Sequence, residues 1–409
     1  LARSGPDCDD ANANAWSACG TCADSDEDGL YGVCDAYVGI TGGDCDDTTP
    51  FCTTSCPDLN FNGNPDCNEI ATVDAGSSYT CAVNRIGIPF CWGYNGLGVL
   101  GVGDDTNRDR PARVPVSDIS RVATGYDTTC AVDTWGGHFC WGTDLGDTPV
   151  EGEWGGVAQS ATGKSGGCWI DAYESWLLCW GSSDNCSHFV DIPYVTYDAP
   201  QNIFEGVVSY EAVSLGYDFG LALASDGRIV CTGLNYYGQC GLGSTSGGTC
   251  FVDPTYVSGI SGVSRISAGW RHACALTSAG NLYCWGDNGG GQAGAPTTTD
   301  PVLAPRAVSG IADPVQVSAG QSHTCAVTGT GSLYCWGANG SGQLGTGTDD
   351  DTSTPTLVTG ISDVKEVACG TDHTCAITND FMLYCWGGNG SGQLGLGGGS
   401  DRATPELVN

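Results

Sequence analysis

Basic residues are scarce in this chain, and the total share of charged residues is small. Charged side chains make up 15% of the 409 residues, and 13 Lys and Arg stand against 47 Asp and Glu, which gives a net charge of −34. A surface of this sign repels phosphate backbones and anionic headgroups, so we expect neither nucleic-acid partners nor insertion into a membrane. It attracts divalent cations. The sequence also has no apolar run long enough to span a bilayer.

A signal peptide and an initiating methionine are also missing, since the chain begins at Leu1. We interpret it as a processed chain or as part of one. Cysteine and glycine, in contrast, are abundant, with 25 and 65 residues. So many cysteines indicate an oxidising compartment, so we expect a secreted or cell-surface protein. The glycine content is typical of turn-rich β structure.

The cysteines mark a repeat of about 50 residues. In its clearest copy, residues 315–347, two short runs of alternating apolar and polar residues flank a glycine-rich turn, which predicts a β-hairpin. Cys325 and Cys335 lie on either side of that turn and are expected to face each other and form a disulfide. The second cysteine of the unit recurs at Cys91, Cys140, Cys179, Cys231, Cys284, Cys335 and Cys385. Seven units of this size predict an all-β protein with a seven-bladed β-propeller.

Six units carry both hairpin cysteines. The predicted disulfides are Cys81–Cys91, Cys130–Cys140, Cys168–Cys179, Cys274–Cys284, Cys325–Cys335 and Cys375–Cys385. The fourth unit has Leu221 at the first position, so Cys231 needs another partner. Two further pairs can form among the remaining cysteines, for example Cys186–Cys231 and Cys240–Cys250, and the sequence leaves this pairing open. Cys369 then stays unpaired and could cross-link to another chain.

Residues 1–69 differ from residues 70–409, the predicted propeller. They contain 14 acidic residues, one basic residue (Arg3) and 8 of the cysteines. We therefore treat them as a separate module stabilised by disulfides and calcium. The last repeat stops in mid-unit near Asn409, and residues 70–76 resemble the missing half. We expect both termini to complete the last blade, which would remove the sheet edges.

Two loops of the N-terminal module follow the calcium-loop pattern D-x-[DN]-x-[DN]-G-x5-E. Oxygen ligands at alternate positions converge on one hard cation, with a carboxylate at position 12 and a backbone carbonyl at position 7. The ligands of the first loop would be Asp24, Asp26, Asp28, Leu30 through its carbonyl, and Asp35. Those of the second would be Asp58, Asn60, Asn62, Asn64 through its carbonyl, and Glu69. Additional candidate ligands are Asp7, Asp9, Asp10, Asp44, Asp46 and Asp47.

No amphipathic helices flank these loops. Residues 7–69 instead resemble the calcium repeats of thrombospondin type 3 and the Cys/Asp-rich metal-binding repeats of bacteria, which implies calcium as the bound ion. The alternative is a solvated acidic linker held by disulfides. We favour calcium, because both loops are complete and each lies beside an Asp-Cys-Asp-Asp cluster.

The repeat unit itself reads A-G-x-x-H-x-C-A-[VL]-T…G-x-L-Y-C-W-G-x-N-x-x-G-Q-L-G. In the clearest copy its residues include Gly320, His323, Trp336, Asn339 and Gln343. Over residues 70–409 this pattern resembles the repeat of the regulator of chromosome condensation family, which implies a seven-bladed propeller. The hairpin cysteines depart from the intracellular members and suit a secreted branch.

Several recurring side chains allow both a structural and a functional interpretation. His272, His323 and His373 occupy one repeat position, and we favour structural hydrogen bonds over a metal site. The recurring tryptophans are expected to pack between blades. The less regular Trp154, Trp169 and Trp176 form our candidate recognition surface.

Asn339 and Asn389 match the N-glycosylation pattern, as does Asn185. The first two belong to the turn of the repeat, so a structural role is the stronger explanation for them.

No nucleophile elbow, phosphate loop or zinc-protease motif is present, so we predict no enzymatic activity. The sequence favours a non-enzymatic extracellular binding or scaffold protein, with calcium rigidifying the N-terminal module. Its partner would be a protein, a glycan or further copies of itself in a surface layer or filament. The alternative is a secreted inhibitor or adhesin, since the resembled family includes a secreted propeller that inhibits β-lactamases. Nucleotide exchange on a small GTPase, the activity of the nuclear member, conflicts with the disulfides and the acidity.

Overall fold

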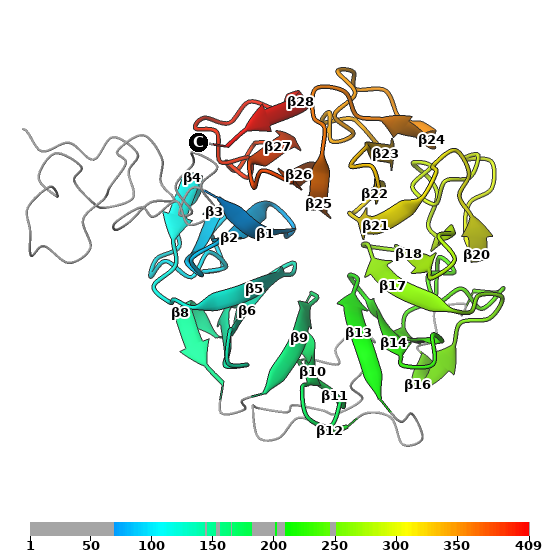
Figure 1. Ribbon diagram of the computed structural model, residues 1–409, viewed down its shortest axis with the longest axis horizontal. Coiled ribbons are helices and arrows are strands. Elements are labelled where there is room, and N and C mark those ends of the chain that lie inside the picture. Colours follow the sequence, from blue (N-terminus) through cyan, green and yellow to red (C-terminus); the bar gives the residue numbers. More distant parts are fainter. Residues whose placement is uncertain are drawn as a thin grey trace, which may run out of the picture.

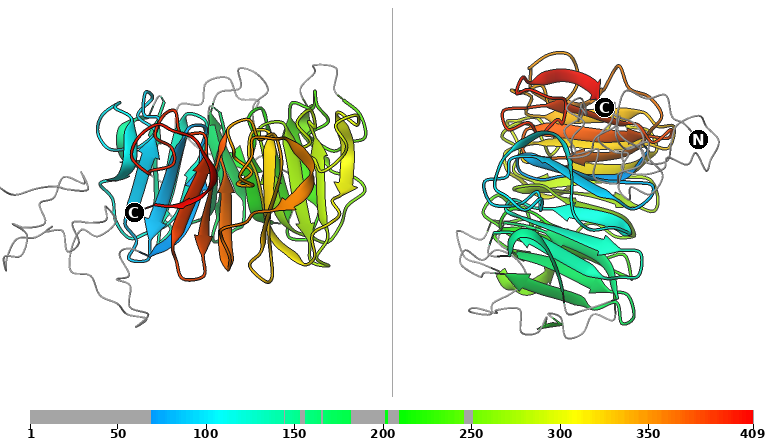
Figure 2. Two further views of the ribbon diagram at one scale, coloured as in Figure 1. Left: turned by 90° about the horizontal axis from the view of Figure 1, so that it is seen from above. Right: turned by 90° about the vertical axis from the view of Figure 1, so that its left-hand side faces the viewer.

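Seven four-stranded antiparallel sheets stand around a central axis and form the blades of a propeller (Figure 1). The computed structural model describes residues 69–143, 145–152, 156–164, 166–181, 201–202, 209–245 and 251–408. Every element in these ranges is a strand, so no helix there could cross a membrane. The predicted all-β, seven-bladed architecture is confirmed, and viewed from the side the ring is a thick disc (Figure 2).

Within each blade the strands follow one another from the axis outward. The innermost strands are β1 (Ile70–Ala75), β5 (Ile119–Thr124), β9 (Val157–Thr162), β13 (Tyr210–Leu215), β17 (Val263–Ala268), β21 (Pro314–Ala319) and β25 (Val364–Cys369). The second strands are β2 (Tyr79–Asn84), β6 (Thr128–Asp133), β10 (Gly166–Asp171), β14 (Phe219–Ala224), β18 (His272–Thr277), β22 (His323–Thr328) and β26 (His373–Thr378).

The outer half of each blade contains the Cys-Trp-Gly strand and a more exposed strand. The third strands are β3 (Pro89–Gly93), β7 (His138–Gly142), β11 (Leu177–Gly181), β15 (Ile229–Gly233), β19 (Leu282–Gly286), β23 (Leu333–Gly337) and β27 (Leu383–Gly387). The outermost strands are β4 (Arg108–Arg113), β8 (Gly146–Glu151), β12 (Gln201–Asn202), β16 (Phe251–Tyr256), β20 (Val302–Ala307), β24 (Thr352–Leu357) and β28 (Arg402–Leu407).

The antiparallel order gives the disc two distinct faces. The turns from the first to the second strand, such as residues 76–78, lie on one face together with the loops between the third and fourth strands; we name it the turn face. The hairpins between the second and third strands, such as residues 134–137, lie on the opposite face with the connections between blades; we name it the hairpin face. The core lies between neighbouring blades, where Trp92 and Trp336 are among the largest fully buried side chains.

Ring closure differs from our prediction that both termini would complete the last blade. The last sheet consists of β25 to β28 alone, and the first of β1 to β4. A whole unit runs from an innermost to an outermost strand, so a chain that enters at Ile70 and leaves after Leu407 contains seven complete units. The ring therefore closes by packing of β1 against β25 and β26. Side-chain hydrogen bonds and backbone bonds, such as that from the N–H of Ile70 to the carbonyl of Phe381 over 2.9 Å, connect the two blades.

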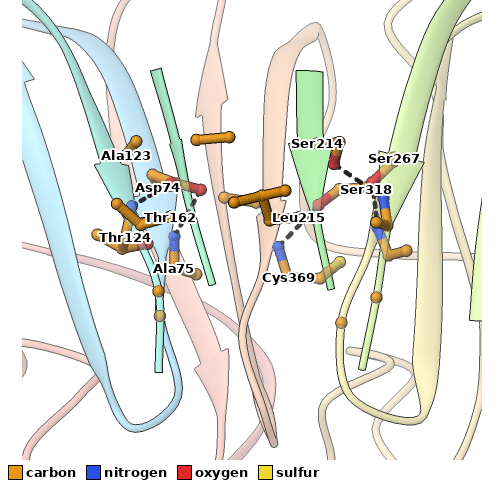
Figure 3. Close-up of a pocket in the computed structure, with 18 of the residues that line it drawn as sticks. Asp74, Ala75, Ala123, Thr124, Thr162, Ser214, Leu215, Ser267, Ser318 and Cys369 are labelled. Atoms are coloured by element: carbon orange, nitrogen blue, oxygen red, sulfur yellow. Dashed lines mark hydrogen bonds between the residues drawn. The ribbon is translucent and has the colours of Figure 1, made fainter. Parts of the chain in front are cut away.

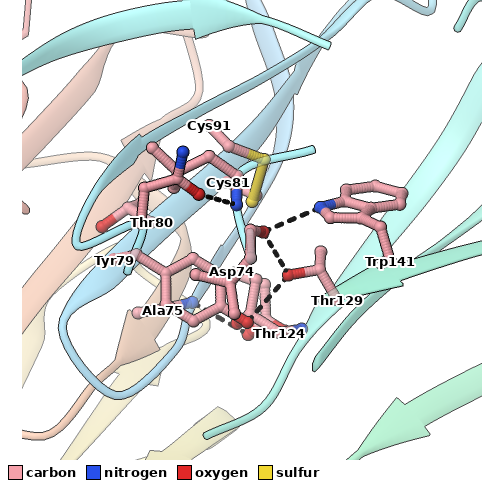
Figure 4. The surroundings of a disulfide bond; sticks show 12 residues. Asp74, Ala75, Tyr79, Thr80, Cys81, Cys91, Thr124, Thr129 and Trp141 are labelled. Atoms are coloured by element: carbon pink, nitrogen blue, oxygen red, sulfur yellow. Dashed lines mark hydrogen bonds between the residues drawn. A yellow bond between two sulfur atoms is a disulfide. The ribbon is translucent and has the colours of Figure 1, made fainter. Parts of the chain in front are cut away.

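The disulfides follow directly from the strand register. In six blades the two hairpin cysteines are paired directly across the second and third strands, as Cys81 is with Cys91 (Figure 4). The structure contains all six predicted hairpin bonds, with Cα–Cα distances of 4.0 to 4.1 Å. On the chain-entropy model, a disulfide that closes a loop of about 11 residues stabilises the fold by roughly 2–3 kcal/mol.

The disulfide of blade 4 rules out the suggested pairs Cys186–Cys231 and Cys240–Cys250. Cys231 is bonded to Cys240, and their Cα atoms are 5.4 Å apart. Leu221 is paired opposite Cys231 in the sheet, so the sulfur has no cysteine across the hairpin. Cys240 replaces the buried leucine of the Gly-Gln-Leu-Gly loop, which folds back over the same strand.

Candidate functional site

The recurring His, Thr, Gln and Trp of the repeat clamp each blade to the next. Between blades 6 and 7, His323 Nε2 is 2.9 Å from Thr374 Oγ1. The Thr374 hydroxyl donates to the backbone carbonyl of Gln343, 2.8 Å away. The Trp386 indole donates to the same carbonyl over 3.0 Å. These bonds connect the second strand, the third strand and the Gly-Gln-Leu-Gly loop across the blade boundary.

The same clamp recurs at other boundaries, with substitutions where the repeat varies. Between blades 5 and 6 it consists of His272, Thr324, Gln292 and Trp336, and between blades 7 and 1 of His373, Thr80, Gln393 and Trp92. Blade 1 has Tyr79 at the histidine position, and its Oη lies 2.8 Å from Thr129 Oγ1 (Figure 4). The expectation that the recurring tryptophans pack between blades is confirmed.

The three histidines of the clamp are neutral and structural. The threonine hydroxyl proton points to the glutamine carbonyl, so the proton shared with His323 must come from its Nε2. The Nδ1 atoms are buried without a hydrogen-bond partner in the described ranges. Burial lowers the pKa of His272 and His323 to about 3 and that of His373 to about 4. These properties match the predicted structural role.

The glycine that precedes each histidine is required by close approach. A Cβ on Gly320 would lie 2.5 Å from the Gly370 carbonyl oxygen and 2.6 Å from Cε1 of His323. Neither the neighbouring backbone nor the buried ring has room to move. The A-G-x-x-H part of the repeat is therefore required by packing at the blade boundary and does not indicate a catalytic group.

Two clusters of His and Cys are also structural. Cys130, His138 and Cys140 place possible ligand atoms within 4.8 Å of one another, as do His323, Cys325 and Cys369. In the first cluster both sulfurs form one disulfide, and in the second Cys325 is bonded to Cys335. The thiolate is the form of cysteine that binds a metal, and a sulfur in a disulfide bond is not a thiolate. Neither cluster is therefore a metal site while these bonds are intact.

The predicted calcium ligands before Glu69 lie outside the described residues. Glu69 itself is buried at the start of β1, and its Oε2 is 2.6 Å from Nη1 of Arg85. This ion pair fixes the beginning of the first blade. The calcium role of both loops stays a prediction.

The innermost strands of all seven blades surround a central cavity of about 770 Å³. Around half of its wall, the side chain at one repeat position accepts a backbone N–H from the next blade (Figure 3). Ser214, Ser267 and Ser318 each do so over 2.9 to 3.0 Å. Asp74 accepts the amide of Thr124 over 2.7 Å, and burial raises its pKa. Side-chain bonds between neighbouring blades thus line part of the cavity wall.

Cys369 lies in this wall and is the free cysteine of the described ranges. Its thiol is buried, and desolvation raises its pKa to about 12. The prediction that Cys369 is unpaired is confirmed. The idea that it cross-links to another chain is wrong for the folded molecule, because a buried, protonated thiol is neither accessible nor nucleophilic.

The three tryptophans predicted to form a recognition surface have different environments. Trp154 lies outside the described residues. Trp169 is 6% exposed, and its ring packs 5.1 Å from that of His138 and 6.2 Å from that of Trp180. Its assignment to a recognition surface is therefore wrong, because it belongs to the core between blades 2 and 3. Trp176 is 46% exposed on the hairpin face.

Two further aromatic residues on this face were missed. Trp135 is 75% exposed at the hairpin of blade 2, and Tyr173 is 83% exposed at the hairpin of blade 3. The two hairpins are connected through Gly156, whose N–H donates to Gly136 and whose carbonyl accepts from Ala172. We name Trp135, Tyr173 and Trp176 the aromatic ridge. Other blades have Ile86, Asp226, Ala279, Thr330 and Asp380 at the corresponding hairpin position, a difference that the sequence alone could have revealed.

Asn339 and Asn389 have a structural role in the third-to-fourth strand loops. Both side chains are fully buried. The Asn339 amide donates to the Thr348 carbonyl over 2.8 Å, and its Oδ1 accepts the amide of Leu344 over 2.9 Å. These side chains are inaccessible to a glycosyltransferase in the folded protein, which agrees with the structural explanation.

The comparison with protein families agrees with this geometry. The repeated blades, their clamps and their meander topology define a seven-bladed propeller built from one recurring unit. A model of the RCC1-like domain matches residues 145–409, and a model of the regulator of chromosome condensation (RCC1) repeat matches residues 87–132. The chain belongs to the family of RCC1-like domain proteins.

The chain matches only part of two curated relatives. The ultraviolet-B receptor UVR8 of Arabidopsis thaliana is 31% identical over 295 residues, which are 70% of this chain and 57% of the receptor. The secretion-regulating guanine nucleotide exchange factor of Bos taurus is 34% identical over 143 residues, which are 33% of this chain and 30% of that protein. The chain thus matches little more than half of the first relative and less than a third of the second.

Solved structures of low sequence identity share the fold. Prp20p of Saccharomyces cerevisiae, which binds Gsp1p and histones, has a TM-score of 0.71 at 21% identity, over 83% of this chain and 87% of that chain. Human WBSCR16 has a TM-score of 0.70 at 22% identity, over 80% of this chain and 94% of that chain. At this identity the likeness concerns the architecture alone.

Proposed function

We propose that this propeller is a non-enzymatic protein-binding module and that it recognises its partner through the aromatic ridge. The observation that carries the proposal is the exposure of Trp135, Tyr173 and Trp176 on adjacent hairpins of one face. Trp and Tyr are enriched among residues that dominate binding energy in protein interfaces. None of the three takes part in the blade clamps, and Trp135 and Tyr173 are more exposed than any other large hydrophobic side chain of the described ranges.

The described histidines support a binding function over catalysis. His138, His272, His323 and His373 are all buried, and burial lowers the pKa of each to about 3 or 4. A general base must reach substrate and titrate near the working pH. None of these four histidines meets either condition. Prp20p provides a precedent for a protein-binding propeller of this fold.

The extracellular setting is part of the same proposal. Seven disulfides occur in the described ranges, and such bonds persist in oxidising compartments. The residues 24–35 and 58–69 would bind calcium and make the acidic N-terminal segment a rigid support for the propeller. Assembly of several copies into a surface layer or filament is the scaffold form of this function.

The proposal can be tested by capturing partners on the wild-type protein and on variants of each face. We expect a soluble or surface protein to be retained by wild type and lost from Trp135→Ser/Tyr173→Ser. The matched control is Tyr236→Ser, which removes an aromatic residue that is 58% exposed on the turn face. Equal retention by all three proteins would contradict the ridge as the recognition surface. The nature of the retained protein, a hydrolase or a structural component, separates an inhibitor from a scaffold.

The calcium part of the proposal needs its own measurement. We would compare sedimentation of the full chain in calcium and in excess chelator, with Asp24→Asn/Asp58→Asn as the ligand-deficient variant. Calcium-dependent assemblies that the variant fails to form would support a calcium-dependent scaffold. A monomer under both conditions would contradict self-assembly and leave partner binding as the function.

A further inference from the structure

A second aromatic group surrounds one side of the channel mouth on the turn face. Tyr126, Tyr217 and Trp270 come from the first turns of blades 2, 4 and 5, and all three line the central cavity. The ring centroids of Tyr126 and Tyr217 are 5.4 Å apart, and those of Tyr217 and Trp270 are 4.7 Å apart. Since blade 3 lies between blades 2 and 4, the two tyrosines must lean over its turn to meet. Together they form a continuous aromatic wall.

The scaffold does not require this wall. At the same repeat position the other blades have Ser77, Lys164, Gln321 and Thr371. The backbone N–H groups of Ser77, Gln321 and Thr371 make equivalent bonds to the next blade. The N–H of Trp270, for example, donates to the Gly320 carbonyl over 3.1 Å, and the N–H of Gln321 donates to that of Gly370 over the same distance. The aromatic side chains therefore add nothing that the repeat needs, and they face small polar residues across the mouth.

Two cationic side chains lie over rings of the aromatic wall, and both interact with nearby carboxylates. The ammonium of Lys164 lies 4.6 Å from the Tyr217 ring centroid, and the Arg271 guanidinium lies 5.6 Å from that of Trp270. Charge interactions with Lys164 and Arg271 act on Asp218, and Asp127 also acts on Lys164. The same cavity is also lined by Arg121, Arg265, Lys365, Asp74 and Glu366. Its wall thus combines charges of both signs, in a protein whose net charge is −34.

We propose that the channel mouth is a binding site for a neutral carbohydrate, the end of a glycan chain. A pyranose ring presents C–H groups on its faces, which suit aromatic rings, and hydroxyls at its edge, which need donors and acceptors. The wall provides the rings, and Gln321, Thr371 and Ser77 provide polar groups opposite. An anion would meet the repulsive field of the whole protein, and a cation would meet Lys164 and Arg271. The cavity volume of about 770 Å³ falls in the range of sites for small ligands.

This site is on the opposite face from the aromatic ridge, so it does not depend on the proposed protein-binding function. The test is titration calorimetry of the full protein with neutral trisaccharides of glucose, mannose, galactose and N-acetylglucosamine, at low and high salt. We expect at least one sugar to bind with an affinity that salt does not change. We expect Tyr126→Ala and Trp270→Ala to weaken binding by about tenfold or more. Trp135→Ala, on the hairpin face, should leave it unchanged.

Trp270 is partly buried, so its variant could lose folding for structural reasons. Tyr126, which is 42% exposed, and Gln321→Ala provide variants that remove ligand contacts with little packing. Loss of sugar binding in these folded variants supports the site. Absence of binding to every neutral sugar, or binding that survives in Tyr126→Ala, overturns the proposal. Binding of an acidic peptide with steep salt dependence, in place of sugars, overturns it as well.

Discussion

Glu366 Oε1 accepts a hydrogen bond from the hydroxyl of Thr72, 2.8 Å away, across the boundary between the last blade and the first. The same oxygen accepts the backbone amide of Val73 over 3.2 Å. Gln316 occupies this repeat position in blade 6, where its Oε1 accepts the amide of Val367 over 2.9 Å. The terminal blades are thus joined by the same type of bond as internal ones, but with a partly buried carboxylate in place of an amide.

This difference predicts the effect of Glu366→Gln. Desolvation raises the pKa of Glu366, so its cost to stability appears as pH rises above the ordinary carboxyl range and is largest at neutral pH. The glutamine keeps the acceptor and has no charge to bury. We expect a higher melting temperature for Glu366→Gln at pH 7 and a smaller gain near pH 4.5, measured by thermal unfolding.

Glu366→Ala should act in the opposite direction. It leaves the amide of Val73 without its acceptor at a partly buried site, which costs about 1–3 kcal/mol. Gln316→Ala is the matched control inside the ring and should cost a similar amount. A wild-type melting temperature for Glu366→Ala would show that this bond does not contribute to ring closure.

The clamp histidines predict acid sensitivity. Burial lowers the pKa of His272, His323 and His373, whereas the unfolded chain binds protons below about pH 6.5. The unfolded state therefore takes up more protons, and the free energy of unfolding should fall as pH decreases from 6.5 towards 4. Each histidine contributes up to about 1.4 kcal/mol per pH unit in that range.

His323→Tyr tests the assignment, since blade 1 already has Tyr79 at this position. The variant should reduce the pH dependence of unfolding between pH 6.5 and 5 by about one proton. Chemical denaturation at several pH values measures this slope. An unchanged slope would mean that His323 titrates normally in the folded protein.

The free thiol and the disulfide of blade 4 can be checked together. We expect Cys369 to resist alkylation at pH 8 in the folded protein and to react after unfolding, because it is buried with a pKa raised to about 12. Peptide mapping without reduction should recover Cys231 linked to Cys240. Recovery of Cys231 linked to Cys186 would restore the pairing suggested from the sequence.

Gly320→Ala should destabilise the protein although it adds a single methyl group. The new Cβ would approach the Gly370 carbonyl oxygen and the His323 ring too closely. Overpacking of this kind costs typically about 1–3 kcal/mol. Gly340→Ala is the control, since a Cβ there meets no atom within 4 Å, and it should unfold at nearly the wild-type temperature.

The architecture could be predicted because the same residue pattern recurs in each unit and predicts the same strands and turns. Cys325 and Cys335 marked facing strand positions, and their spacing carried over to five other blades. The sequence did not show at which strand of the repeat each blade begins. Nothing in residues 70–76 shows whether they begin a blade or finish one, because the same strand pattern would serve either arrangement.

Side-chain exposure was the other limit of the sequence. Trp169 and Trp135 are both irregular tryptophans, yet the first lies on a second strand facing a neighbouring blade and the second on a hairpin tip. The partner of Cys231 could not be predicted from strand register, because Cys240 lies in a loop that folds back over the strand. The channel mouth was missed for the same reason, since its aromatic residues come from three blades.

Site-specific photocrosslinking can show whether the partner contacts the aromatic ridge. A photoreactive phenylalanine analogue would replace Trp135 in one protein and Leu97, which is 40% exposed on the turn face, in another. Both would be irradiated in native source material that contains the proteins present with this chain. We expect a discrete partner adduct from position 135 and none from position 97. Adducts from position 97 alone would contradict this expectation and place recognition on the turn face.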